Sequence, residues 1–155
     1  MTQDNVERNR SITHTFPSLE WSTELMIRLN TDAKFKSVGS RWEGDVNLYI
    51  EGVPGARSSQ VIYIDSWHGT CRGVDFCMEE DARPAAFQIK APLGNWKRVL
   101  SQEIGPIQAM ISGQVRVFGN LAYILRNVGS TQRMVEVAAT IPTRFLNWVR
   151  FCLGS

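Results

Sequence analysis

The sequence has few cysteines and no long apolar run, and both absences narrow the class of protein. The three cysteines are an odd number and include no C-x-x-C pair, so a reducing compartment is favoured over a disulfide framework. No apolar stretch approaches the roughly 20 residues that cross a bilayer. The polar start, MTQDNVERNR, lacks the apolar segment of a secretory signal. These absences predict a soluble, cytoplasmic protein.

The chain also lacks an excess of charge of either sign. Lysine and arginine number 17 against 15 acidic residues, and the basic residues are scattered along the 155-residue chain. Proteins that bind nucleic acid usually present a clustered basic face, so no nucleic-acid partner is expected. Apolar residues make up 43%, which is typical of one folded domain. We predict a loose N-terminal tail over residues 1–17 and a single domain over residues 18–155.

Motifs of catalysis and metal binding are missing as well. There is no G-x-S-x-G elbow, and Ser66 and His68 stand roughly 7 Å apart on one face of a predicted strand. Cys71 and Cys77 share a strand face but lie about 20 Å apart, too far for one zinc ion. The glycines match neither a phosphate-binding loop nor a dinucleotide fingerprint. We therefore predict no enzyme activity, no catalytic residue, no metal site and no cofactor.

What the sequence does contain is a clear alternation of helix and strand patterns. Ser18 can cap a helix whose apolar residues follow helical spacing, and residues 33–37 suit a short second helix. Period-2 alternation then predicts neighbouring strands joined by short loops, which favours an antiparallel meander. The predicted elements of this half are a helix near 18–30 and strands at 44–51, 60–67 and 70–78.

The second half continues with strand and helix signals in turn. Gly105-Pro106 separates two helical patterns, and Gly119-Asn120 turns the chain before a further helix that Asn120 can cap. The predicted elements are strands at 85–90 and 114–119 and helices near 92–104, 106–112 and 120–128. Together the five strands predict an α+β fold with one mainly antiparallel sheet, covered by helices on one side.

The pattern after Gly129 is ambiguous. Val135, Val137, Ala139 and Ile141 alternate as in a strand, although Met134 and Ala138 also fit a helix. From Pro142 a last helix is predicted over 143–152, with its apolar stripe at helical spacing. This C-terminal helix would either pack on its own domain or make transient contact with a membrane or an enzyme. The stripe consists of Phe145, Trp148, Val149 and Cys152.

One segment resembles a known family. Gly105, Pro106 and Ala109 precede the run Gly113-Gln-Val-Arg-Val-Phe-Gly119-Asn120, which has the form G-x-V-x-V-x-G-[ND]. Together with the order of elements over roughly residues 20 to 130, this run resembles the sterol carrier protein type-2 family, most strongly after residue 85. The resemblance implies an apolar tunnel between sheet and helices. It also implies non-catalytic binding or transfer of a sterol, a fatty acid or a fatty acyl-CoA.

Apolar stripes usually form an ordinary core, but the resemblance favours a hydrophobic cavity. Under that interpretation the helical stripes after Pro92 and a neighbouring strand residue contact the lipid. The expected ligand-binding residues are Trp96, Leu100, Ile107, Met110, Ile111, Phe118, Leu121, Ile124, Leu125 and Val128. Lys97, Arg98 or Arg116 would hold a charged head. The alternative is an accessory or interaction protein of a separate lipid- or cofactor-metabolising enzyme.

Overall fold

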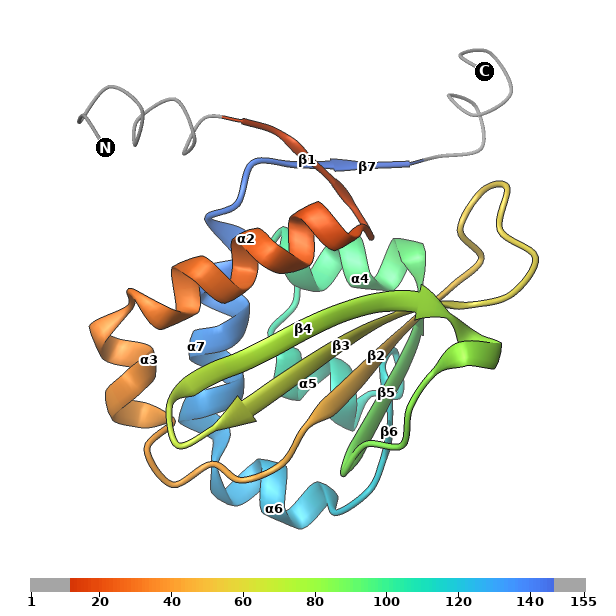
Figure 1. The fold of residues 1–155 in the computed structure, drawn as a ribbon. Coiled ribbons are helices and arrows are strands. Elements are labelled where there is room, and N and C mark those ends of the chain that lie inside the picture. Colours follow the sequence, from red (N-terminus) through yellow and green to blue (C-terminus); the bar gives the residue numbers. More distant parts are fainter. Residues whose placement is uncertain (1–11, 147–155) are drawn as a thin grey trace.

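The computed structural model describes residues 12–146 and places a twisted five-stranded sheet at the centre (Figure 1). The strand order is β4-β3-β2-β5-β6, and every neighbouring pair is antiparallel except β2 and β5, which run parallel. This confirms the predicted sheet of five mainly antiparallel strands. The strands are β2 (Val46–Glu51), β3 (Gln60–Trp67), β4 (Thr70–Met78), β5 (Phe87–Pro92) and β6 (Arg116–Phe118).

The helices gather on one face of this sheet, as predicted (Figure 1). Three of them begin where a polar side chain caps the first turn: Ser18, Asp32 and Asn120 each accept a backbone N–H three residues ahead. The helices are α2 (Leu19–Asn30), α3 (Ala33–Val38), α4 (Leu93–Leu100), α5 (Pro106–Ile111), α6 (Leu121–Arg126) and α7 (Val128–Ala139). A 3-10 turn, η1 (Glu79–Asp81), follows β4.

Several predicted boundaries differ from the structure by two residues or more, and two of them have a clear physical reason. The strand predicted at 85–90 is β5, which begins at Phe87 and runs through Pro92, because it continues its pairing along the whole of β2. The helix predicted near 92–104 ends at Leu100, where backbone N–H groups of the following turn bond back to its last carbonyls.

The ambiguous segment after Gly129 is a helix. Its buried and cavity-facing residues, including Thr131, Met134, Val135 and Ala138, recur at i, i+3, i+4 and i+7. The strand-like alternation of Val135, Val137 and Ala139 therefore arises by chance in a segment that is helical. Packing of α7 against α2, α3, α4 and α5 decides the conformation.

Both ends of the described chain differ from the prediction. Within the predicted tail, β1 (His14–Phe16) is a strand, and it pairs in parallel with β7 (Thr143–Phe145). The predicted C-terminal helix is wrong over these three residues, and its part from residue 147 lies outside the described residues. The pairing is held by Trp21, whose Nε1 donates to Thr143 Oγ1 at 3.0 Å. The rings of Phe16 and Phe145 lie 5.6 Å apart.

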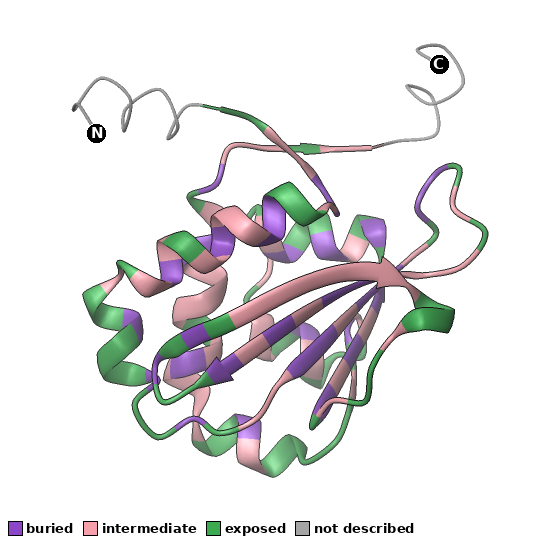
Figure 2. Ribbon diagram, in the orientation of Figure 1, coloured by how far each residue is buried: buried purple, intermediate pink, exposed green. Residues whose placement is uncertain are grey.

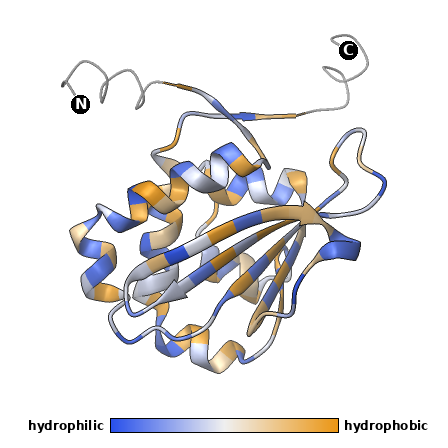
Figure 3. Ribbon diagram, in the orientation of Figure 1, coloured by the Kyte–Doolittle hydropathy of each residue, from blue (hydrophilic) through white to orange (hydrophobic). Residues whose placement is uncertain are grey.

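The core lies between the sheet and its helical layer. Figure 2 shows buried residues along the strands and on the inner sides of the helices, and Figure 3 shows apolar and polar residues alternating along the sheet. Phe16, Trp21, Leu29 and Phe35 are among the completely enclosed side chains. Over residues 12–146, no helix has both the length and the apolar character needed to cross a membrane.

Candidate lipid-binding cavity

A cavity lies inside this core, between the inner face of the sheet and the helices. Its volume is about 90 Å³, measured as the space open to the centre of a water-sized sphere. One water molecule needs roughly 10–15 Å³ on that measure, so the cavity is several times larger than a single hydration site. Its walls are Phe16, Trp21, Leu25, Trp42, Val46, Leu48, Ile64, Phe87, Ile89, Trp96, Val99, Leu100, Pro106, Met110, Val115, Ile124, Ser130, Thr131, Met134, Val135 and Ala138.

Strand register builds one wall of the cavity. Side chains two apart on a strand point to the same face, so Val46 and Leu48 of β2 both face the helices. The parallel pairing sets Val46 beside Phe87 and Leu48 beside Ile89 on β5. On the other side of β2, Val46 lies opposite Ile64 of β3. The result is a continuous apolar floor across three strands.

Three tryptophans give the cavity aromatic rings without hydrogen-bond donors. Each indole N–H bonds away from the cavity: Trp21 to Thr143, Trp42 to the Gly44 carbonyl at 2.8 Å, and Trp96 to the Tyr49 carbonyl at 3.0 Å. Among the described residues, no charged side chain lines the cavity, and only two lining residues carry hydroxyls. Burying an ion among such groups would be very unfavourable, whereas burying hydrocarbon is favourable. The cavity is therefore suited to an apolar ligand.

A second hollow adjoins the cavity on its helical side. It has a volume of about 220 Å³ on the same measure and shares Val99, Pro106 and Val135 with the cavity wall. Unlike the cavity, the hollow carries several polar side chains. They are Gln102 after α4, and Gln132 and Glu136 on α7.

Four of the residues expected to contact lipid line the cavity: Trp96, Leu100, Met110 and Ile124. Two others are partly buried without lining it, Ile107 on α5 and Val128 at the start of α7. The remaining four lie at the surface. Their exposed fractions are 67% for Ile111, 49% for Phe118, 38% for Leu121 and 40% for Leu125. Contact of the four lining residues with a lipid stays a prediction.

The three basic residues considered for a charged head lie outside the cavity. Arg98 donates to Gln114 and lies 3.7 Å from Glu103, and Arg116 pairs with Glu51. Lys97 lies over the ring of Phe145, 5.9 Å from its centre. These cations already have partners, so none is aimed at the cavity as an anchor.

Sequence reasoning missed the walls built by the first half of the chain. The missed walls include Trp21 and Leu25 on α2, Trp42 in the loop between α3 and β2, and the inner faces of β2 and β3. Their spacing identifies buried faces, as in any core, and carries no separate sign of a cavity. Which buried faces leave space between them depends on tertiary packing.

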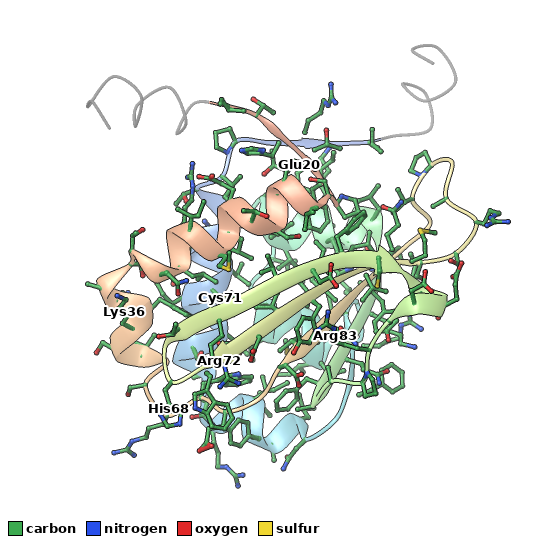
Figure 4. The ribbon with its side chains drawn as sticks, viewed as in Figure 1. Glu20, Lys36, His68, Cys71, Arg72 and Arg83 are labelled. Carbon is green, nitrogen blue, oxygen red and sulfur yellow. The ribbon has the colours of Figure 1, made fainter. Side chains whose placement is uncertain are left out.

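The cysteine and histidine residues considered for chemistry lie on the β3–β4 hairpin (Figure 4). Cys71 is buried, and burial raises the pKa of its thiol to about 11. Burial also raises the pKa of Cys77, and nearby carboxylates add to the effect. His68 is stacked on the exposed Trp67 ring. Across residues 12–146, no group of three metal-ligating side chains comes together.

The comparison with known proteins decides the family. The model of the SCP-2 sterol transfer family matches residues 25–130. The chain belongs to this family. A crystal structure of sterol carrier protein 2 is 28% identical with a TM-score of 0.75, covering 80% of this chain and 97% of that chain. No curated protein matches the chain.

Two further structures extend the comparison. The solution structure of a conserved hypothetical protein from Thermus thermophilus, described as possibly a sterol carrier protein, has a TM-score of 0.75 at 27% identity. It covers 82% of this chain and 90% of its own. A sterol carrier protein domain of Helicoverpa armigera shares the fold at 13% identity, with a TM-score of 0.54 over 77% of this chain and 86% of its own. Membership of the SCP-2 family supports binding or transfer of a lipid.

The family match does not include the whole cavity. Phe16 and Trp21 precede residue 25, and the α7 residues from Thr131 to Ala138 follow residue 130. The sheet floor and the α4–α6 wall thus lie within the SCP-2 match, whereas two walls are contributed by flanking segments of this chain.

Proposed function

We propose that the protein is a non-catalytic carrier that takes the hydrocarbon part of a lipid into the cavity. The lipid classes are sterol, fatty acid and fatty acyl-CoA. The observation that carries this proposal is the apolar lining, in which the N–H groups of Trp21, Trp42 and Trp96 are bonded elsewhere. Each CH₂ group removed from water contributes about 0.8 kcal/mol, so a long chain binds without a charged anchor.

The same lining sets limits on how the lipid sits. A carboxylate or phosphate would find no charged partner among the described lining residues, so an ionised head stays outside the cavity. Met110 and Met134 lie on different helical walls, and their unbranched side chains adapt to irregular ligands. Rotation of such side chains enlarges the space as the ligand enters. The cytoplasmic location remains a prediction from composition.

Extraction of the purified protein with organic solvent, followed by mass spectrometry, tests the proposal. A lipid that co-purifies at a fixed ratio to protein is the expected result. A second arm compares Met110→Trp, which fills the cavity, with Leu125→Trp, which enlarges an exposed side chain. We expect the first to abolish uptake of a fluorescent fatty acid and the second to leave it unchanged, with both proteins folded. Unfolding by Met110→Trp would show a close-packed core instead, where overpacking costs about 1–3 kcal/mol.

A further inference from the structure

The hollow beside the cavity combines apolar residues with polar side chains. It shares Val99, Pro106 and Val135 with the cavity wall, so the two spaces adjoin at these three residues. Its own polar groups are Gln102, Gln132 and Glu136. Within the described residues, neither glutamine amide bonds to another protein group, so both are free to bind a ligand oxygen.

Among the described residues, one charged side chain lines the hollow, and it is acidic. Glu136 is the charged residue that lines it, and its carboxylate lies 3.0 Å from Arg133. Arg133 in turn binds Asp32 at 2.7 Å. Two carboxylates thus share one guanidinium, which leaves this group of three with a net charge of −1. An anionic head would therefore meet repulsion here, and the described residues that line the hollow include no cation to offset it.

Gln102 occupies a backbone position that a glutamine seldom takes. Its φ is 60°, in the left-handed region, directly after the C-cap of α4. Glycine or asparagine is preferred at this point of a helix end. A long amide side chain at the rim of the hollow is thus kept at some conformational cost, a pattern that is typical of functional positions.

We propose that this hollow binds the neutral hydroxyl of a lipid and selects against lipids with an anionic head. Gln102 and Gln132 hydrogen-bond the hydroxyl, while Glu136 repels a carboxylate. The inference rests on the proposed carrier function, because it assigns the head of a ligand whose hydrocarbon fills the cavity. It goes further by ranking the lipid classes: a sterol or long-chain alcohol binds ahead of a fatty acid.

Two lipids with the same chain test the ranking. Competition of 1-hexadecanol and of hexadecanoate against a neutral fluorescent acyl ester gives the two affinities at neutral pH. We expect the alcohol to bind about tenfold more tightly, which is the order of effect of one well-placed polar interaction. Equal affinities, or tighter binding of the acid, would overturn the inference and leave the carrier function standing. Failure of the neutral ester itself to bind would refute the carrier function and this inference with it.

Variants assign the effect to the hollow. Glu136→Gln should raise the affinity for hexadecanoate several-fold and leave that for hexadecanol unchanged, relative to the matched control Glu103→Gln outside the hollow. Gln102→Gly should weaken hexadecanol binding several-fold while the melting temperature stays the same or rises, because glycine relieves the left-handed backbone. Equal effects of Glu136→Gln and Glu103→Gln, or unchanged alcohol binding by Gln102→Gly, would contradict the assignment.

Discussion

At the scale of single residues, Asn30 ties α2 to the edge strand of the sheet. Its Nδ2 donates to the Cys71 carbonyl and its Oδ1 accepts from the Cys71 N–H, both at 2.8 Å. The two bonds satisfy a backbone segment of β4, which is an outer strand of the five-stranded sheet. Cys71 is 2% exposed, so water does not replace these bonds easily.

We expect Asn30→Ala to lower the free energy of unfolding by about 1–3 kcal/mol, because it leaves two buried backbone groups without partners. Urea denaturation measures the change. The neighbouring Thr31→Ala serves as a control, since the Thr31 hydroxyl bonds within its own helix end and is exposed. Equal denaturation midpoints for the two variants would show that the bonds of Asn30 contribute nothing.

Asp32 makes stability depend on pH at the acid end. Its carboxylate caps α3 through Phe35 N–H and binds Arg133 of α7, and the bond to Arg133 is the main reason that its pKa is lowered from the ordinary value of 3.8. Because the folded pKa lies below the unfolded one, this stabilisation is complete well above pH 3.8 and is lost as pH falls through the folded pKa.

The free energy difference between wild type and Asp32→Asn should therefore be constant near neutral pH and shrink on acidification. Asparagine caps a helix as well as aspartate does, so the difference reports the ion pair with Arg133, which predicts about 0.5–1 kcal/mol at neutral pH. Urea titrations at a series of pH values from neutral to strongly acidic follow the difference. A difference that stays constant down to the lowest pH would rule out a contribution from ionised Asp32.

The sequence located the helices that line the cavity, but it did not separate their inward-facing apolar residues from their outward-facing ones. Trp96 and Leu100 lie on a helix of eight residues and line the cavity as expected. Leu121 and Leu125 lie on α6, which has six residues, and they face outward. Fewer than two turns do not define which side faces the sheet, so apolar content alone over-predicts the lining.

At the scale of elements, local signals located most helices and strands, and long-range pairing decided the rest. Strand β7 exists because β1, far away in sequence, supplies its hydrogen-bond partners. No local pattern around Phe145 indicates that pairing, and its apolar spacing suited a helix. The parallel pairing of β2 with β5 could not be predicted from local sequence either, since it depends on how the chain returns to the sheet.

The β1–β7 pair leads to a prediction about truncation. Removing the chain after Ile141 deletes β7. With it go Thr143, which accepts the hydrogen bond of the Trp21 indole, and the Phe145 ring that lies beside Phe16. Trp21 and Phe16 both line the cavity, so we expect a lower melting temperature and faster release of bound lipid. Truncation after Leu146, which keeps β7, should leave both closer to the wild-type values. Identical behaviour of the two truncated proteins would mean that β7 has no such role.

At the scale of the whole molecule, the fold class followed from the strand and helix patterns together with the family resemblance. Alternation in three neighbouring strands predicted the meander β2-β3-β4, and the helical stripes predicted a single covering layer. The cavity could not be predicted in the same way, because it is the space that remains between the sheet and the helices after they pack. Its walls combine α2, the sheet, α4 to α6 and α7, which are spread over the chain from Phe16 to Ala138.

The central claim is that a lipid chain enters this cavity, and its tryptophans report on entry directly. Bromine quenches indole fluorescence at short range. Trp21, Trp42 and Trp96 line the cavity, whereas Trp67 lies at the end of β3 and is 37% exposed. Titration with a brominated long-chain alcohol should quench the emission saturably, with one lipid per chain. The extent of quenching should fall in Trp96→Phe and persist in Trp67→Phe. Quenching that does not saturate, or that disappears only with Trp67, would contradict the account.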